Sequence, residues 1–159
     1  MYRPFGDAFV DGVDFFIQNG APDNYDELAK RLENFNRAYR ARTPVQLTAT
    51  PRCGYPDRSV QRALATGLFT RIFVRFYDDA KCAAHLQQEW GKWTAAYPSA
   101  QIFLGLPATE RKVGYVNPKN LQGGALSGVQ KAANYGGVMI WERFEDKRTG
   151  YSRYAIKWA

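Results

Sequence analysis

The chain has 159 residues, a formal net charge of +7, 45% hydrophobic and 15% aromatic residues, two cysteines and one histidine. That length allows one globular domain that buries most of its surface, and the frequent aliphatic and aromatic residues exclude intrinsic disorder. One histidine excludes a metal site made of several histidines, and two cysteines exclude a disulfide-rich miniprotein. No apolar run approaches about 18 residues, so we expect no membrane-spanning segment. Because Arg3, Asp7, Asp11 and Asp14 occur so early, we also expect no signal peptide in this chain.

The positive charge has two interpretations. A polyanionic partner would account for it, and so would a solvated basic surface. The basic residues are scattered and alternate with acidic ones, without a run of five like charges. This pattern favours the solvated surface, and we expect no nucleic-acid partner.

Apolar segments bounded by glycine alternate with segments of helical periodicity along the chain. Mixed β-branched and aromatic residues predict five strands, at residues 9–17, 45–50, 71–77, 101–107 and 136–141. Helices are predicted between and after them, at residues 24–39, 58–65, 82–97 and 121–133, with one or two further turns at 151–158. Alternating strands and helices predict an α/β protein with a parallel sheet and crossover helices.

The loops that follow the predicted strands carry the unusual residues, at 18–20, 51–53, 77–79, 107–109 and 141–143. In α/β folds this carboxyl edge of the sheet is where sites form. No glycine-rich phosphate loop of either common type is present, so we expect no nucleotide cofactor, and we assign no metal.

The segment DGVDFFIQ, residues 11–18, resembles the D-x-x-D-x-D-x-E strand of glycoside hydrolase family 18, in its plant class III (hevamine-like) chitinase branch. Further segments resemble that branch in order and spacing: RPFGDAFVDGVDF, LTATPRCGYPDR, FVRFYDD, IFLGLPA and YGGVMIWERF. The resemblance covers only the second half of the family's (β/α)8 TIM barrel, its strands four to eight. It therefore implies that residues 1–159 form a single C-terminal half-barrel.

In the family, the last Glu of the motif protonates the glycosidic oxygen, and the Asp two residues earlier positions the substrate's N-acetyl group for attack. Asp11 and Asp14 keep the motif, but Phe16 and Gln18 replace those two acids. Alternation along a strand directs positions 14, 16 and 18 to one side. Since Gln18 has no acidic proton and Phe16 forms no hydrogen bond, we predict no chitinase activity and assign no catalytic residue. The two replacements either fill the barrel interior or leave a cleft for another use.

Three residues are the candidates for a surviving sugar site. Tyr77 matches the family tyrosine that hydrogen-bonds the N-acetyl carbonyl, and Trp141 matches the indole that forms the floor of the central sugar subsite. Arg75 stands where the chitinases usually have a neutral polar residue, which makes the cleft more basic. The alternative is that Tyr77 and Trp141 are packing aromatics.

The two cysteines, Cys53 and Cys82, lie 29 residues apart, the spacing of the last disulfide in hevamine-like chitinases. The resemblance implies a disulfide, which would require an oxidising compartment and a secreted protein. The alternative is a pair of buried free thiols.

Phe16 most resembles the corresponding residue of the cereal xylanase inhibitor proteins, which derive from chitinases. In those proteins a loop after the fourth helix inserts an Arg among the catalytic carboxylates of a xylanase. The matching loop here holds Arg37, Arg40 and Arg42 before Pro44. Guanidinium groups bind carboxylates in a bidentate manner, although cations also occur at ordinary helix C-termini.

Three functions follow from the resemblance. The first is a plant defence protein that inhibits a fungal or plant xylanase. The second is a chitin-oligosaccharide-binding protein without hydrolysis, and the third is a storage or vestigial homologue. An active chitinase would require another acid, such as Glu142, to replace the missing one.

A half-barrel would leave two sheet edges, at the first and last predicted strands, whereas a closed barrel has none. We expect Phe15, Phe16, Val138 and Ile140 to be exposed there, in a larger patch than monomers normally show. The expected result is a homodimer formed through these edges, or poor solubility.

Overall fold

The computed structural model describes residues 6–8, 10–39 and 44–157. Its five strands form one parallel sheet in the order β1-β2-β3-β4-β5. The strands are β1 Gly12–Phe15, β2 Gln46–Ala49, β3 Arg71–Arg75, β4 Gln101–Pro107 and β5 Tyr135–Trp141. The predicted α/β class and parallel sheet are therefore confirmed, although the first three strands are shorter than predicted.

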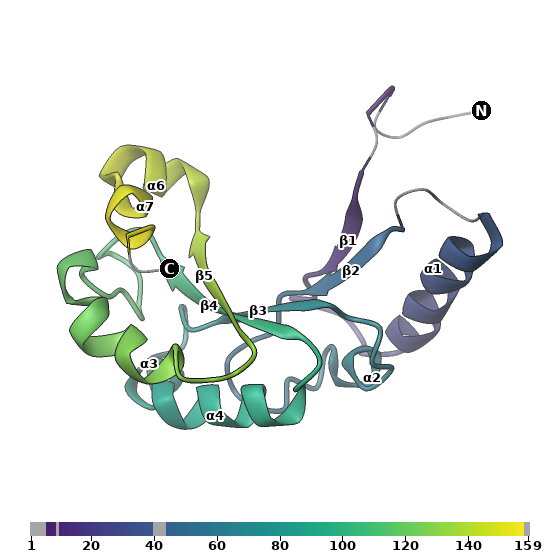
Figure 1. Cartoon of the computed structure of the whole chain (residues 1–159), viewed down its shortest axis with the longest axis horizontal. Coiled ribbons are helices and arrows are strands. Elements are labelled where there is room, and N and C mark those ends of the chain that lie inside the picture. The colour runs from purple at the N-terminus through teal and green to yellow at the C-terminus, as the bar shows by residue number, and fades with distance from the viewer. Residues whose placement is uncertain (1–5, 9, 40–43, 158–159) are drawn as a thin grey trace.

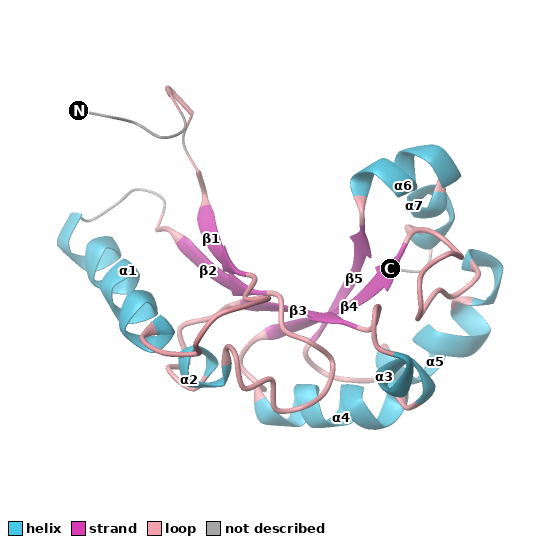
Figure 2. Ribbon diagram, turned by 180° about the vertical axis from the view of Figure 1, so that it is seen from behind, coloured by secondary structure: helices cyan, strands magenta, loops and turns pink. Residues whose placement is uncertain are grey.

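The sheet is curved, and α1, α2, α3 and α4 lie on its convex side, as Figure 1 shows from one side and Figure 2 from the other. The helices are α1 Tyr25–Tyr39, α2 Gln61–Leu64, α3 Ala80–Ala84, α4 Leu86–Ala96, α5 Ser127–Val129, α6 Arg143–Thr149 and α7 Tyr151–Ala155. A 3-10 turn, Pro118–Asn120, and a π-helical turn, Gln122–Leu126, precede α5. No helix in these ranges has the length and apolar character needed to cross a bilayer.

The structure differs from the predicted helices in three places. The helix predicted at 82–97 is divided at His85, whose dihedral angles (φ −118°, ψ 32°) interrupt the helical backbone between α3 and α4. The segment predicted as one helix at 121–133 contains three glycines and forms only short, irregular turns. Helix α6 was not predicted, because its one large apolar residue, Phe144, is exposed and no hydrophobic period marks the segment.

The core lies between the convex side of the sheet and the helices. Alternate residues of the β3 segment, Ile72, Val74 and Phe76, are fully buried there. On α4, Trp93 is also fully buried, and its indole Nε1 donates to the backbone oxygen of Cys53 at 2.7 Å. On the other side of the sheet, Phe73 and Phe103 are half-buried with ring centroids 4.8 Å apart, whereas Tyr77 is buried.

Strands β1 and β5 are the two edges, and among the described residues neither is paired on its outer side. The expectation for Phe15 was wrong: its side chain is buried on the convex side, 3% exposed, in edge-to-face contact with Phe69 at 5.0 Å. Phe16, Val138 and Ile140 are half-buried. The edges themselves still present unpaired backbone groups, so self-association stays a prediction.

We predict that the 159-residue chain associates with itself at micromolar concentration, because pairing satisfies the backbone groups of the two edges. Multi-angle light scattering should give a mass above the 18.1 kDa of one chain, with the mass decreasing on dilution. A soluble species of 18.1 kDa at every concentration, with a cooperative thermal transition, would contradict this prediction.

Candidate functional site

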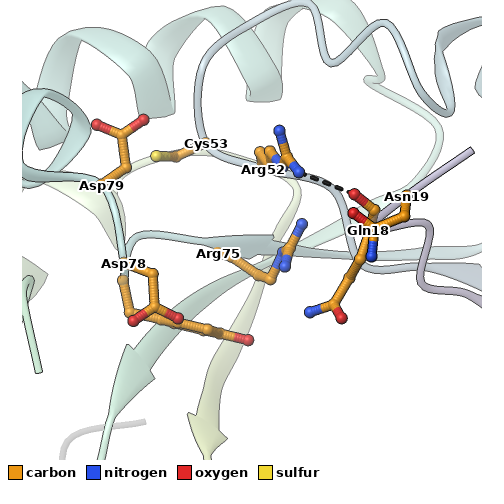
Figure 3. Close-up of a pocket in the computed structure, with 8 residues that line it drawn as sticks. Gln18, Asn19, Arg52, Cys53, Arg75, Asp78 and Asp79 are labelled. Carbon is orange, nitrogen blue, oxygen red and sulfur yellow. Dashed lines mark hydrogen bonds between the residues drawn. The ribbon is translucent and has the colours of Figure 1, made fainter.

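A cavity of about 400 Å³ lies at the carboxyl ends of β1, β2 and β3. Parallel strands bring these ends together at one edge of the sheet, where α/β proteins place their sites. Figure 3 shows the residues that line the cavity: Gln18, Asn19, Arg52, Cys53, Arg75, Tyr77, Asp78 and Asp79.

The motif strand contributes one lining residue and one aromatic neighbour. Gln18 lines the cavity with an exposed side chain. Phe16 lies beneath the Arg75 guanidinium, whose carbon is 4.7 Å from the centroid of the Phe16 ring. The same ring contacts Trp141, with the ring centroids 5.7 Å apart. Position 16 therefore supplies an aromatic surface to a cation, where the family motif has a carboxylate.

The two retained acids of the motif do not line this cavity. Asp14 is held from β2: its Oδ1 accepts from the Thr48 hydroxyl at 2.6 Å, and its Oδ2 accepts from the Thr50 hydroxyl at 2.7 Å. Asp11 precedes β1, and its backbone oxygen accepts from the Gln46 amide at 2.9 Å. Both oxygens of Asp14 thus accept from the β2 segment, which joins the two neighbouring strands.

Arg75 is buried, with only 8% of its surface exposed. Its Nε donates to the backbone oxygen of Pro51 at 3.4 Å, while its Nη2 has no hydrogen-bond partner within the described chain. Burial lowers the pKa of the Arg75 guanidinium, and the nearby charge of Arg52 lowers it further. The charges of Asp57 and Asp78 offset part of this lowering of the Arg75 pKa, although neither carboxylate is in an ion pair with Arg75 in the described part of the chain.

Tyr77 is 4% exposed, and its ring stacks on Trp141 at 5.7 Å with an angle of 17° between the planes. Its hydroxyl has no partner among the residues described. Burial raises the pKa of this hydroxyl, so Tyr77 remains neutral at physiological pH. Trp141 ends β5, is half-buried and is joined to Glu142 by a cis peptide bond.

The acidic lining residues already have partners. Asp78 pairs with Lys112 at 3.0 Å, and Asp79 accepts the backbone amide of Cys82 at 3.0 Å, which caps α3. Asp79 also lies near the sulfurs of Cys53 and Cys82, in a group whose potential ligand atoms are within 4.8 Å of one another. Those sulfurs form a disulfide with a Cα–Cα distance of 6.0 Å, which confirms the predicted pairing. A disulfide offers no thiolate, so this group is not a metal site.

The structure brings Gln18, Arg75 and Tyr77 together around the cavity, with Phe16 and Trp141 as aromatic neighbours. Arg52 was missed as a site residue, although its place directly after the second predicted strand was a usable signal. Its Nη2 donates to the backbone oxygen of Gln18 at 3.0 Å.

Arg37, the one arginine of the predicted inhibitor loop that the structure describes, does not line the cavity. Arg37 is in the last turn of α1 and pairs with Glu33 at 3.2 Å, whereas Arg40 and Arg42 lie outside the described residues. The Asn36 side-chain amide donates to the Val45 backbone oxygen at 3.0 Å, and its Oδ1 accepts from the Val45 backbone amide at 2.8 Å, just before β2 begins. These bonds place Arg37 at the amino edge of the sheet, opposite the cavity.

The sequence profile described as Glycosyl hydrolases family 18 matches residues 1–130. The chain therefore belongs to glycosyl hydrolases family 18. Xylanase inhibitor protein 1 of Oryza sativa subsp. japonica is 53% identical to this family 18 chain, over 100% of the chain and 55% of the relative. Xylanase inhibitor protein 1 of Triticum aestivum is 49% identical over 94% of the chain and 51% of the relative. An acidic endochitinase of Arabidopsis thaliana is 39% identical over 94% of the chain and 51% of the relative.

Solved structures show the same similarity in three dimensions. The xylanase and alpha-amylase inhibitor protein from Scadoxus multiflorus superposes with a TM-score of 0.89 and 30% identity, over 98% of this chain and 59% of that chain. Tamarind chitinase-like lectin gives a TM-score of 0.86 and 32% identity, over 95% of this chain and 58% of the lectin chain. Concanavalin B superposes with a TM-score of 0.88 and 33% sequence identity, over 98% of this chain and 59% of the concanavalin B chain. The family 18 chain spans about half the length of the curated relatives it matches.

The disulfide fixes the cavity wall that carries Cys53 and Asp79, and its removal should destabilise the chain. We expect the double variant Cys53→Ala, Cys82→Ala to lose about 3 kcal/mol of unfolding free energy, because the bridge spans 29 residues of the unfolded chain. Urea unfolding followed by tryptophan fluorescence measures this loss. Reduced unmodified chain serves as the control and should match the double variant. A loss below about 1 kcal/mol would show that the bridge contributes little to stability.

Proposed function

We propose that this chain is a catalytically inactive, chitinase-like protein of the xylanase-inhibitor type. The observation that carries the proposal is the replacement of two motif acids by Phe16 and Gln18, beside a buried arginine instead of a carboxylate. The two carboxylates that line the pocket, Asp78 and Asp79, follow β3 rather than the motif strand, and they already engage Lys112 and the Cys82 amide. Glu142, the possible substitute acid, is not among the residues that line the cavity.

The similarity to named inhibitors supports the same proposal. Xylanase inhibitor proteins of rice and wheat are 53% and 49% identical to this chain, compared with 39% for the endochitinase of Arabidopsis thaliana. The partner that we propose is a fungal or plant xylanase, with plant defence as the biological role. A disulfide, together with relatives of this kind, supports a secreted protein.

We also propose that β1 to β5 correspond to strands four to eight of the family's (β/α)8 barrel, with residues 1–159 as a single C-terminal half-barrel. The parallel order of the strands supports this assignment, as do TM-scores of 0.86 to 0.89 over about three-fifths of the related chains.

For the inhibitory surface we propose the loop that carries Arg37, Arg40 and Arg42. Arg37 supports this choice because its side chain is 74% exposed and is presented by the last turn of α1. The Asn36 bonds to Val45 hold the two ends of the loop close to each other. Three guanidinium groups in one short segment suit capture of the carboxylates in a xylanase cleft.

Binding of a chitin oligosaccharide is the second function to test, because the half-buried indole of Trp141 stacks on Tyr77 beside the cavity. Such an aromatic pair offers a face for a pyranose ring. A storage or vestigial role would leave both the loop and the aromatic pair without a ligand.

The loop is tested by reversing its charge. We expect Arg40→Glu to weaken inhibition of a susceptible fungal xylanase by at least about tenfold, because like charges would then face the catalytic acids. Arg37→Glu should weaken it less, since Glu33 already engages this arginine. Arg153→Glu, an exposed arginine on α7, is the matched control and should leave inhibition unchanged.

Initial xylanase rates at increasing inhibitor concentration give the inhibition constants, and a chitin-bead assay run in parallel measures sugar binding. Unchanged inhibition by both loop variants would exclude the loop as the inhibitory surface. If the unmodified chain inhibits no xylanase of a representative panel, the proposed function itself is wrong.

A further inference from the structure

The segment that follows β1 contains a chemically reactive dipeptide, Asn19-Gly20. The side-chain carbonyl carbon of an asparagine is an electrophile, and the backbone nitrogen of the next residue can attack it within the same chain. A side chain on that next residue shields the nitrogen, and glycine has none. The chain has seven asparagines, and Asn19 is the only one that a glycine follows.

The structure leaves both reacting groups accessible. Asn19 and Gly20 are exposed and lie in a bend beyond β1, which ends at Phe15. In the described part of the chain, no hydrogen bond engages the side-chain amide of Asn19 or the backbone nitrogen of Gly20. Apart from its chain neighbours, no heavy atom lies within 4 Å of the position that a Cβ would take on Gly20. Neither packing nor hydrogen bonding therefore restrains the dipeptide.

Two other asparagines show the contrast. The Asn134 amide donates to the backbone oxygens of Thr94 at 3.1 Å and Tyr97 at 3.0 Å, and the Asn36 side chain exchanges two hydrogen bonds with Val45. Each side chain would have to leave these partners before it could turn toward the next backbone nitrogen. The residues that follow them, a tyrosine and an arginine, also carry side chains. The structure thus favours reaction at position 19.

Asn19 also lies where a change of charge alters a binding surface. It lines the cavity at the carboxyl ends of β1, β2 and β3, and it lines a second cavity of about 480 Å³ that includes Gly20. Arg52 lines both cavities, and its guanidinium bonds the backbone oxygen of Gln18, directly before Asn19 (Figure 3). A carboxylate at position 19 would share these walls with a guanidinium, which favours the charged form of the acid.

We propose that Asn19 is a self-modification site, at which the folded chain converts a neutral amide into a carboxylate. The Gly20 nitrogen loses its proton and bonds to the side-chain carbonyl carbon of Asn19, and that carbon releases its amide nitrogen as ammonia, which carries the proton away. Water then opens the cyclic imide at either carbonyl and leaves aspartate or isoaspartate at position 19. Each conversion lowers the formal net charge of +7 by one. The reaction needs water alone, so it is independent of the proposed xylanase inhibition.

Incubation of the full chain at mildly alkaline pH, followed by peptide mass mapping, tests the proposal. We expect a mass gain of about 1 Da in the peptide that contains Asn19, with release of ammonia and earlier elution from a cation-exchange column. The rate should rise with pH, because the attacking nitrogen must lose its proton. It should lie within about threefold of the rate in a synthetic peptide of residues 16–22, since no contact restrains the dipeptide. A rate in the folded chain more than about tenfold below that of the peptide, or earlier modification of Asn36 or Asn134, would overturn the proposal.

Variants identify the reacting atoms. Gly20→Ala should slow the reaction by about tenfold or more, because the added methyl group shields the attacking nitrogen. Asn19→Gln keeps the amide but requires closure of a larger ring, so it should remove the mass gain, and it provides the test if Gly20→Ala disturbs the bend, where φ is +96°. Asn120→Gln changes an exposed asparagine that a leucine follows, and it should leave the rate at position 19 unchanged. An undiminished mass gain in Asn19→Gln, or an equal slowing in Asn120→Gln, would contradict the assignment.

Discussion

Phe16 follows one edge strand of the sheet and Trp141 ends the other, and their rings lie 5.7 Å apart. This contact links the carboxyl ends of β1 and β5, and the rest of the site is built on its two rings. Trp141 stacks on Tyr77, and the Arg75 guanidinium lies over Phe16. A carboxylate at position 16 would pair with the guanidinium but would offer no surface to the indole. One aromatic residue therefore links the ends of the two edge strands and supplies the surface beneath the guanidinium.

The two candidate functional regions lie at opposite ends of the parallel strands. At the carboxyl edge, the cavity is enclosed by strand ends and stabilised by the disulfide that joins Cys53 to α3. At the amino edge, the last turn of α1 and the start of β2 are joined through Asn36. In the described part of the chain, the side chains of Asn36 and Arg37 hydrogen-bond to Glu33 and Val45 and not to residues that line the cavity. Substitutions at the two ends of the strands should therefore have additive effects on stability.

The sequence was sufficient for the features that depend on local pattern. Apolar runs bounded by glycine and proline gave the strand positions, and family resemblance gave the disulfide. Local pattern could not give features that depend on tertiary contacts. The direction of Phe15 depends on Phe69 and α1, and the missing partner of Arg75 depends on Ser59 and backbone amides engaging Asp57. Helix α6 has no hydrophobic period and is held by other segments: Arg111 pairs with Glu145 at 2.7 Å, and the Thr149 hydroxyl donates to the Ala108 backbone oxygen at 2.9 Å.

Phe16 and Gln18 take the places of the two motif acids, and hydrolysis of a fluorogenic chitotrioside tests most directly whether the pocket lacks a general acid. The unmodified chain should release fluorophore no faster than buffer at every pH from acidic to neutral, because Phe16 and Gln18 replace the two acids of the motif. The double variant Phe16→Asp, Gln18→Glu, assayed beside it, shows what restoring the two acids adds. Clear turnover by the unmodified chain, proportional to its concentration and retained after repurification, would contradict the account.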